Sequence, residues 1–344
     1  MRSKEEKSAK AKIWYDNNLS KFNACTEEIS KLIEKIINNN DIVFQNISCR
    51  VKSEESFLKK CDNDKYNIPE KQITDVIGIR IITYTNKEVR QICKIIEEEF
   101  EIDLKNSVNK ADSLADNKVG YLSVHFVASL SKQRNKLTEY SQIKNLKFEI
   151  QVRTLLQHAW AEIEHDKSYK FSGELRKDLK RNFSLIAGVL ELMDQEFEKL
   201  SDEIDNYAAS VLEETENGNF DIAIDSTSLK EYMKNKFEKY NMEINTIDSD
   251  IIKELKDFGL NTLKDIEEIM LLDDILTTDN SYYGILRDIM IINNADKYFN
   301  NSYNTENWRG IEYNEIKLYK EYGVDIAPYI KKFDLTLFDE SDYV

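Results

Sequence analysis

The chain has little glycine, proline, cysteine or histidine for its length. Its 344 residues include 9 Gly, 2 Pro, 4 Cys and 3 His. Because Gly and Pro interrupt regular backbone structure, their scarcity predicts a protein made mostly of helices and strands, with helix dominant. The four cysteines contain no C-x-x-C pair, which argues against zinc knuckles and against a disulfide framework. We interpret Cys49, at an apolar position of an expected strand, as an ordinary core residue.

Long apolar segments are also missing. No apolar run approaches the ~20 residues that a membrane-spanning helix needs. The charged N-terminus is not followed by the apolar core of a signal peptide. We therefore expect a soluble, cytoplasmic protein with no membrane partner. The chain is long enough for two domains that each bury a core.

The negative charge is concentrated in the last part of the chain. The formal net charge is −16. Residues 217–344 hold 14 Lys and Arg against 26 Asp and Glu, a balance of −12, whereas the first 216 residues hold 34 against 38. This distribution argues against broad nucleic-acid binding by the second part and leaves room for a cationic pocket in the first.

The first 216 residues combine helical and strand patterns. Apolar residues at helical spacing predict helices over residues 12–39, 53–61, 87–100 and 174–214. Alternating or β-branched stretches predict strands over residues 44–52, 77–84, 120–130 and 147–153. This part of the chain therefore reads as an α+β domain.

The segment Asn217-Gly218-Asn219 marks the expected boundary between two domains. Beyond it the pattern is almost entirely helical, with helices expected over residues 227–240, 249–258, 262–272, 281–299 and 312–322. Gly259 and Gly323 suit helix C-terminal caps, and Thr262 suits an N-cap. We predict one domain over residues 1–216 and an acidic, mainly helical accessory or regulatory domain over residues 217–344.

Three of the expected strands have a polar face of unusual composition. A merely solvated face is typically built from Thr, Lys, Glu and Ser. These faces instead combine cations for phosphates, an aromatic ring for a base and a carboxylate for a metal ion. The residues are Arg50, Lys52, Tyr121, Ser123, His125, Glu149, Gln151 and Arg153. Their combination favours a ligand-binding cleft over a solvent-exposed face.

Asp75 and Arg80 frame a further strand, within Asp75-Val-Ile-Gly-Ile-Arg80. Strict alternation places them on opposite faces of the sheet. Both reach one cleft only if the strand bulges or twists near Gly78. The sequence leaves this open.

Two of the three histidines lie on one helical face, where His158, Glu162 and His165 have a spacing compatible with zinc. They lack the H-E-x-x-H order, and neighbouring carboxylates satisfy histidines equally well. We therefore disfavour a zinc site at this helix. The single His165-Asp166 dipeptide, without further histidines, does not make a phosphohydrolase site.

Four blocks of the sequence resemble the synthetase domain of the RelA/SpoT family in order and spacing. They are Arg50-Val-Lys-Ser-Glu-Glu-Ser56 with Lys59, Asp75-Val-Ile-Gly-Ile-Arg80, Gly120-Tyr-Leu-Ser-Val-His125, and Glu149-Ile-Gln-Val-Arg-Thr154 followed by His158-Ala-Trp-Ala-Glu-Ile-Glu-His165. The resemblance covers about residues 12–215. It implies a nucleotidyltransferase-like mixed β-sheet flanked by helices. It also implies a small alarmone synthetase without a hydrolase domain, carrying a C-terminal extension.

The implied reaction transfers pyrophosphate from ATP to the 3′-hydroxyl of GTP or GDP and makes (p)ppGpp-type alarmones. Asp75 and Glu149 are the implied catalytic residues and Mg²⁺ ligands, and Glu149 is also placed to help deprotonate the acceptor hydroxyl. For ATP, the resemblance implies that Arg50 and Arg80 sandwich the adenine, a role for planar guanidinium groups. The implied triphosphate contacts are Lys52, Ser53 and Lys59.

The resemblance assigns the acceptor nucleotide to a second set of residues. They are Lys118, Tyr121, Ser123, His125, Gln151, Arg153 and His158. Tyr121 is expected to stack on the acceptor base, a contact worth about 1–3 kcal/mol in other nucleic-acid complexes.

One departure from the family concerns the acceptor. Alarmone synthetases usually carry a basic loop of Lys-Pro-Lys-Asn-Gly type before the stacking tyrosine. Here residues 111–120 keep only Lys118, beside Asp112 and Asp116. A less phosphorylated guanine nucleotide, an adenine nucleotide or the 3′-end of tRNA therefore stays open as the acceptor. The tRNA reaction belongs to toxic members of the family, and the acidic C-terminal domain would then restrain it.

Two further alternatives concern activity and assembly. An inactive nucleotide-binding sensor is one, although retention of both Asp75 and Glu149 argues against it. The apolar helices beyond residue 217 need burial, which we assign mainly to the core of that domain. The alternative is an interface in a homo-oligomer.

Overall fold

The structure is a computed structural model that describes residues 4–109, 123–170, 176–237, 244, 246–270 and 281–338. The chain divides into two compact units, Met1–Leu200 and Ser201–Val344. One long helix, α7 (Lys177–Glu216), begins in the first unit and ends in the second. The domain boundary expected from the sequence, after residue 216, lies at the end of this helix.

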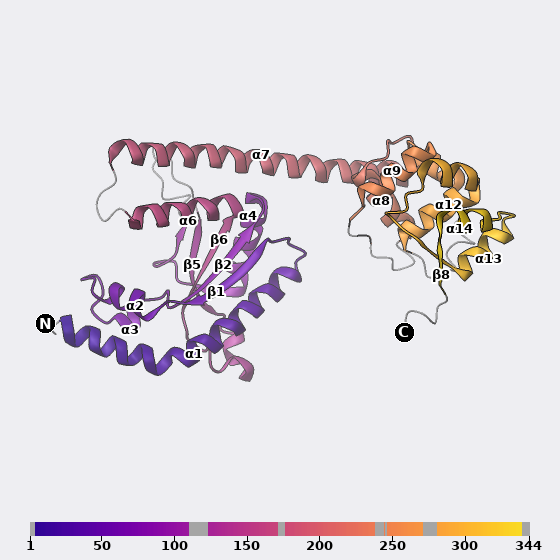
Figure 1. Ribbon diagram of the computed structural model, residues 1–344. Coiled ribbons are helices and arrows are strands. Elements are labelled where there is room, and N and C mark those ends of the chain that lie inside the picture. The colour runs from indigo at the N-terminus through magenta and orange to yellow at the C-terminus, as the bar shows by residue number, and fades with distance from the viewer. Residues whose placement is uncertain are drawn as a thin grey trace. The chain divides into compact units, whose positions relative to one another are not determined.

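The first unit contains a mixed sheet and the helices around it (Figure 1). Its strands are β1 (Asn46–Val51), β2 (Ile77–Thr83), β3 (Phe100–Ile102), β4 (Val108–Asn109), β5 (Val124–Leu130) and β6 (Phe148–Thr154). Its helices are α1 (Lys4–Asn38), α2 (Glu54–Cys61), α3 (Pro69–Gln72), α4 (Asn86–Glu99) and α6 (Leu155–Lys170), with short 3-10 turns η1 (Arg134–Lys136) and η2 (Thr138–Tyr140).

The strands are ordered β1-β2-β6-β5-β3, and β4 also pairs with β5. β2 and β6 are parallel, whereas the other pairs are antiparallel. The parallel pair β2 and β6 occupies the middle of the sheet. The mixed sheet flanked by helices predicted from the sequence is therefore confirmed.

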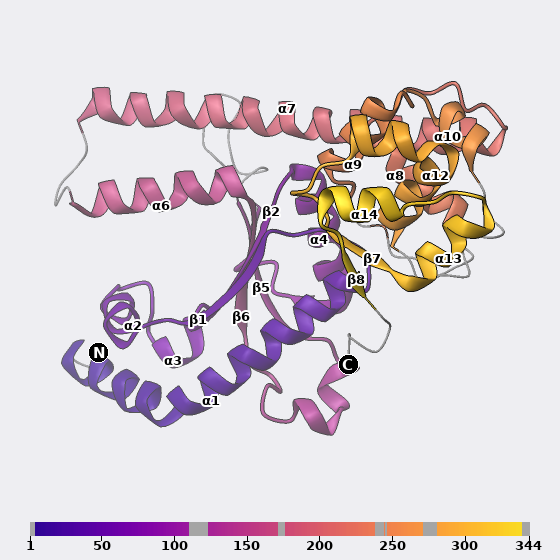
Figure 2. The same ribbon diagram turned by 45° about the vertical axis from the view of Figure 1, so that its right-hand side comes forward.

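One face of this sheet is apolar and carries the core of the first unit. Ile79 of β2 and Ile150 of β6 are almost completely buried there, together with Ile92 of α4 and Ile29 of α1. Figure 2 shows α1 and α4 on this side of the strands, with α2 and α6 toward the other side. Because side chains alternate along a strand, the opposite face is left to the polar residues of the same strands.

Local sequence signals account for several helix ends. Ser53 caps α2 as predicted, since its side chain accepts a hydrogen bond from the backbone N–H of Ser56. Thr85 and Glu88 form a capping box at the start of α4. The helix expected from residue 174 is observed from Lys177 and runs without a break to Glu216.

The structure changes two interpretations that were made from the sequence. Cys49 is exposed, so its interpretation as a core residue is wrong. It lies on β1, the edge strand of the sheet, where one neighbouring strand is missing. Asp75 precedes β2, which begins at Ile77, so the alternation of that strand does not fix the direction of the Asp75 side chain.

The second unit is mainly helical, as predicted. Its helices are α8 (Ser226–Phe237), α9 (Ser249–Phe258), α10 (Leu263–Ile269), α12 (Tyr282–Lys297), the π-helical turn η4 (Tyr298–Ser302), α13 (Tyr313–Glu321) and α14 (Ala327–Phe333). Short strands β7 (Gly310–Glu312) and β8 (Thr336–Phe338) pair in parallel. The sequence reading did not anticipate α14 or these strands.

The predicted caps of the second unit are observed. Gly259 follows α9 with a φ of 91°, and Gly323 follows α13 with a φ of 74°, values that favour glycine. Thr262 caps α10 by accepting a hydrogen bond from the N–H of Asp265. In the described parts of the chain, every helix is too short or too polar to cross a membrane.

Candidate functional site

The register of the sheet brings polar residues from three strands onto one face. Arg50 of β1 lies opposite Gly78 of β2, which in turn lies opposite Glu149 of β6. One step along the sheet, Ser48, Arg80 and Gln151 form a second row. Residues paired across neighbouring strands point to the same side, so both rows face away from the apolar core.

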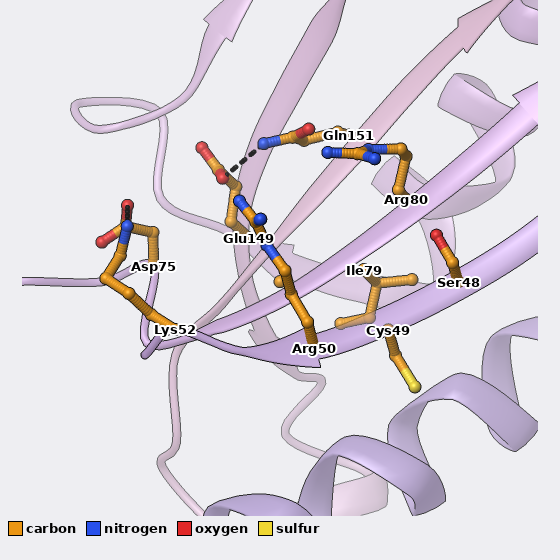
Figure 3. Close-up of a pocket in the computed structure, with 10 residues that line it drawn as sticks. Ser48, Cys49, Arg50, Lys52, Asp75, Ile79, Arg80, Glu149 and Gln151 are labelled. Carbon is orange, nitrogen blue, oxygen red and sulfur yellow. Dashed lines mark hydrogen bonds and ion pairs between the residues drawn. The ribbon is translucent and has the colours of Figure 1, made fainter. Parts of the chain in front are cut away.

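These rows border a pocket of about 240 Å³ in the first unit. Figure 3 shows Arg50, Glu149, Gln151 and Arg80 on the same side of the strands, while the sulfur of Cys49 points to the other side. Asp75 and Lys52 lie together at one end of the group. The residues that line the pocket are Ser48, Cys49, Arg50, Lys52, Asp75, Gly78, Ile79, Arg80, Glu149 and Gln151.

Asp75 is held by two lysines from different elements. Its Oδ2 atom lies 2.7 Å from Lys60 Nζ and 3.0 Å from Lys52 Nζ. Burial alone would raise the pKa of Asp75, but the hydrogen bonds and charges of Lys60 and Lys52 outweigh it and lower that pKa. The carboxylate is therefore ionised at neutral pH.

The backbone around Lys52 fixes the direction of its side chain. The Lys52 N–H donates to the carbonyl of Val76 at 2.8 Å, and its carbonyl accepts from the Tyr15 hydroxyl at 2.6 Å. Since Val76 adjoins Asp75, this pairing carries Lys52 to the same end of the pocket as the carboxylate.

Glu149 is positioned by its neighbours on the same face. Gln151 Nε2 donates to Glu149 Oε2 at 2.8 Å, and His125 Nδ1 lies 3.2 Å from Glu149 Oε1. The other ring nitrogen of His125 lies 2.7 Å from the hydroxyl of Ser123. Burial would raise the pKa of Glu149, but hydrogen bonds from His125 and Gln151 lower it, while the negative charge of Asp75 acts in the opposite direction.

Arginines concentrate positive charge beside the two carboxylates. Arg153 is 5% exposed, and burial together with the charges of Arg80 and Arg50 lowers its pKa to about 10. Its Nη2 group donates to Oε1 of Gln151. Arg80 pairs at 3.1 Å with Glu162 of α6. Burial and neighbouring positive charge thus disfavour the cationic form of Arg153, and an anion beside it would favour that form.

His158 of α6 adjoins the same arginine group. Burial, followed by the charges of Arg80 and Arg153, lowers its pKa, so the imidazole is neutral near pH 7. Its Nδ1 atom is 3.8 Å from Glu162 Oε1, beyond ordinary hydrogen-bond length. A neutral imidazole accepts or donates a hydrogen bond without adding charge to the arginine group.

Four buried polar atoms around the pocket have no hydrogen-bond partner among the described residues. They are Asp75 Oδ1, Arg80 Nε, Arg153 Nε and His158 Nδ1. Buried polar groups in folded proteins are almost always paired. Unpaired groups of both signs in one place are typical of a site that a polar ligand completes.

Asp75 and Glu149 supply the carboxylates suited to a hard divalent cation. Within the described ranges, no group of three or more His, Cys, Asp or Glu is placed to hold a metal ion. Mg²⁺ is commonly bound through one or two carboxylates together with substrate phosphates. The unpaired Asp75 Oδ1 and the two ionised carboxylates fit that pattern.

Lys60, which pairs with the pocket residue Asp75, was missed by the sequence analysis. On α2 the buried residues are Phe57 and Cys61, and Lys60 stands beside them on the side that reaches Asp75. Lys59, which the resemblance suggested, is exposed, whereas Lys60 is half-buried, and neither lysine is among the residues that line the pocket. The helical spacing of Phe57 and Cys61 is the signal that distinguishes the two lysines.

Apart from Lys59 and His158, described above, the predicted residues divide into three groups in the structure. Six of them line the pocket, namely Arg50, Lys52, Asp75, Arg80, Glu149 and Gln151. Ser123, His125 and Arg153 join these through hydrogen bonds, and Ser53 caps the adjacent helix α2. Lys118 and Tyr121 lie outside the described residues, as does the side chain of His165.

A family model matches the part of the chain that contains the pocket residues from Arg50 to Gln151. The family model described as the region found in RelA / SpoT proteins matches residues 49–174. GTP pyrophosphokinase YjbM of Bacillus subtilis strain 168 is 26% identical over 168 residues, which span 48% of this chain and 75% of that protein. GTP pyrophosphokinase YwaC of the same organism is 25% identical over 160 residues, which span 45% and 73%.

A solved structure is also similar. The crystal structure of small alarmone synthetase 1 from Bacillus subtilis shares 22% identity, with a TM-score of 0.47. The match covers 56% of this chain and 98% of that one.

Proposed function

Residues 49–174 form a RelA/SpoT region, and from this premise we propose that the first unit is a pyrophosphokinase that moves pyrophosphate from ATP to a guanine nucleotide. The observation that carries the proposal is the pairing of Asp75 and Glu149 in one cationic pocket. Phosphoryl-type transfer depends on alignment and on neutralising phosphate charge, with little covalent help from the protein. Ionised carboxylates for a metal ion, surrounded by Arg and Lys, meet both needs.

Arg50 and Arg80 are suited to hold the adenine of ATP between them. They stand on adjacent antiparallel strands, and Arg50 is diagonal to Arg80 because it pairs with Gly78. Diagonal neighbours on such strands are about 7–8 Å apart, roughly twice a stacking distance. Gly78, directly opposite Arg50, has no side chain and so leaves the floor of the pocket open.

Lys52 and Lys60 are suited to the ATP phosphates. Both stand at the Asp75 end of the pocket, and both have an ammonium group within 3.0 Å of Asp75 Oδ2. The N-terminus of α2, capped by Ser53, adds backbone N–H groups that favour anions. A triphosphate at this end would lie next to the carboxylates that hold its metal ion.

Mg²⁺ is the proposed cofactor, with Asp75 and Glu149 as its protein ligands. Bound there, it would neutralise charge on the transferred phosphates. Glu149 would in addition accept a hydrogen bond from the attacking 3′-hydroxyl, and its orientation is set by Gln151 and His125. Arg153 and Ser123 continue the same face and would meet the acceptor nucleotide.

GTP or GDP is the acceptor we propose, supported by the two GTP pyrophosphokinases to which the chain is similar. The acidic composition of residues 111–120, with Lys118 beside Asp112 and Asp116, favours testing a second candidate. That candidate is transfer to the 3′-end of tRNA, restrained by the acidic second unit. An adenine nucleotide is a further candidate of the same kind.

The acceptor is tested with purified protein, Mg²⁺ and ATP labelled in its β and γ phosphates. GTP, GDP, ATP and deacylated tRNA are offered separately, and the labelled product is separated by chromatography. Label on GTP or GDP supports the proposal, whereas label on tRNA, or on an adenine nucleotide with a 3′-pyrophosphate, replaces it with one of the other candidates. Binding of ATP without transfer to any acceptor would support an inactive sensor.

The restraint is tested by comparing the full chain with residues 1–216, after circular dichroism has established that the shortened chain is folded. Higher transfer to tRNA by the shortened chain supports restraint by the second unit. Equal or lower transfer by the folded shortened chain contradicts it.

A further inference from the structure

A buried carboxylate of helix α7 reaches the start of helix α6. Asp194 of α7 is 1% exposed, and its Oδ2 atom accepts a hydrogen bond from the Thr154 hydroxyl at 2.7 Å. Thr154 is the last residue of β6, directly after Arg153, and is fully buried. A buried carboxylate costs free energy unless hydrogen bonds replace the water that it loses. The Thr154 hydroxyl is one of the donors on which the position of Asp194 depends.

The same hydroxyl caps α6. Thr154 Oγ1 accepts a hydrogen bond from the backbone N–H of Gln157 at 3.1 Å, and Gln157 Oε1 accepts one from the backbone N–H of Thr154 at 3.0 Å. This reciprocal pair is a capping box, which fixes the first turn of a helix. A hydroxyl has one proton and two lone pairs. Because the proton is donated to Asp194, the lone pairs are left for the Gln157 N–H, and Asp194 sets the direction in which Thr154 caps α6.

Gln157 attaches the first turn of α6 to a second helix. Its Nε2 group donates to Oδ1 of Asn86 at 3.2 Å, and Asn86 is the first residue of α4, which follows β2. The start of α6 is therefore held at two points, by α7 through Thr154 and by α4 through Gln157. Both points lie at the ends of the two central strands, β2 and β6.

Helix α6 brings Glu162 to the nucleotide pocket. Glu162 Oε1 lies 3.1 Å from Nη1 of Arg80, which lines the pocket (Figure 3). The Glu162 side chain is 55% exposed, so its place is set by the helix that carries it and not by close packing around it. A planar guanidinium stacks on a base only in one orientation. The position of α6 therefore decides how Arg80 is presented to the pocket.

We propose that Thr154 and Asp194 are positioning residues for the nucleotide pocket. They fix the start of α6, and α6 holds the Arg80 guanidinium, through Glu162, in the orientation that stacks on adenine. The inference rests on the proposed role of Arg80 in ATP binding, and it assigns Thr154 and Asp194 no contact with ATP. It affects the adenine end of the pocket alone, because the lysines proposed for the phosphates stand on elements other than α6.

The inference is tested by calorimetric titration of the full chain, in Mg²⁺, with ATP and with inorganic triphosphate. Thr154→Val removes the hydroxyl and keeps the branched shape, and it should weaken ATP binding about tenfold while triphosphate binds as before. Thr154→Ser keeps the hydroxyl and should restore ATP binding. Glu198→Gln is the matched control, since it removes a different contact of α7, the ion pair with Arg90 of α4.

The outcomes separate positioning from general damage. Unchanged ATP affinity in Thr154→Val overturns the inference, and so does a folded Thr154→Val protein that loses ATP and triphosphate to the same extent. An equal loss of ATP binding in Glu198→Gln would show that any loosening of α7 has this effect, and it overturns the assignment to Thr154 as well. A wild type that does not bind ATP contradicts the proposed function, and this inference with it.

The last step is tested at an exposed position, where folding is not at risk. Glu162→Ala removes the partner of Arg80 and should lower the affinity for ATP relative to that for triphosphate. Expressing the result as a ratio cancels the change in charge, because both ligands are anions. A ratio equal to that of the wild type overturns the inference.

A second measurement follows α6 without any nucleotide. Burial, followed by the charges of Arg80 and Arg153, lowers the pKa of His158 of α6. If Thr154→Val releases the start of α6, this pKa should rise toward its ordinary value of about 6.5, whereas Glu198→Gln should leave it unchanged. Proton NMR titration follows the signal, which His158→Gln identifies among the three histidines. An unchanged His158 pKa in Thr154→Val would show α6 in its original place and would overturn the inference.

Discussion

Lys60 Nζ lies 2.7 Å from Oδ2 of Asp75, so helix α2 and the segment before β2 meet in one ion pair at the edge of the pocket. The contact joins a cation suited to phosphate with a carboxylate suited to a metal ion. Burial alone would lower the pKa of Lys60, but the hydrogen bond to Asp75 together with nearby negative charge, chiefly that of Asp75, outweighs burial and raises it. The two groups stay charged together across the neutral range.

Lys60 is expected to matter more for ATP than its neighbour Lys59. Lys60→Ala should raise the KM for ATP by about 10–100-fold, since a hydrogen bond to a charged group is worth about 1.5–3 kcal/mol. Lys59→Ala, on the exposed side of α2, serves as the matched variant and should have the smaller effect. Steady-state kinetics of both proteins decide this, and a larger loss from Lys59→Ala would contradict the position assigned to Lys60.

ATP binding is expected to require Gly78, because any side chain at this position would occupy the pocket. A Cβ at this position would lie 3.9 Å from Arg50 Cγ, an ordinary contact, so the protein should still fold. Gly78→Val should nevertheless weaken ATP binding at least about tenfold, because its methyl groups would fill the floor of the pocket. Gly78→Ala should be intermediate. Calorimetric titration with ATP measures the effect, and wild-type affinity in Gly78→Val would show that the pocket does not hold the nucleotide.

His125 is expected to influence the acid limb of the pH–rate profile through its hydrogen bond to Glu149. Its hydrogen bond lowers the pKa of Glu149, so His125→Ala should raise that pKa and move the acid limb to higher pH. Activity well above this limb should be less affected, since Glu149 is ionised there in both proteins. The measurement is kcat/KM between pH 4 and 8. A limb that stays in place would mean that another group titrates.

Arg153 is expected to lower the stability of the ligand-free protein and to strengthen the binding of an anion. Burial and the charges of Arg80 and Arg50 disfavour its cationic form, as its lowered pKa of about 10 shows. Arg153→Gln should therefore leave the melting temperature of the empty protein unchanged or higher. The increase in melting temperature on adding GTP should shrink, because stabilisation follows ligand affinity. Strong destabilisation without ligand would instead indicate a structural role.

The stability of the second unit is expected to depend on the buried carboxylate of Glu254. Glu254 is 2% exposed and accepts hydrogen bonds from Arg287, Tyr298 and Asn307 at 2.8–2.9 Å. Glu254→Ala should cost about 3–5 kcal/mol, because it leaves the guanidinium of Arg287 buried without its partner. Asp257→Ala, at an exposed position of the same helix, is the control. Hydrogen exchange of peptides from α9 and α12 should accelerate only in the first variant.

The sequence was sufficient for the elements that display one apolar face. Alternation predicted β1, β5 and β6 because the apolar residues of these strands mostly face a single core, with Cys49 of β1 as an exception. Helix α9 was predicted with its observed ends. Strand order was not predictable in the same way, since 64 residues separate Thr83, the last residue of β2, from Phe148, the first residue of its neighbour β6. Pairing over such a distance depends on the whole core.

The residues of the candidate site were also only partly predictable from the sequence. Six of the predicted residues line one pocket, because the register places Arg50, Gly78 and Glu149 in a row. The position of Asp75 remained open because it precedes the strand and does not follow its alternation. Lys60 was overlooked because adjacent lysines differ only in the helical face they occupy. Cys49 was misread because its strand lies at the edge of the sheet.

The central claim is tested most directly by following both terminal phosphates of doubly labelled ATP in the presence of GDP and Mg²⁺. The wild type is expected to move both labels together to the 3′-position of GDP and to release AMP. Glu149→Gln should reduce the rate by about 10²–10⁴-fold, the usual contribution of a positioned proton acceptor. Label that remains on ATP, appears as free phosphate, or moves equally fast in Glu149→Gln would contradict the account.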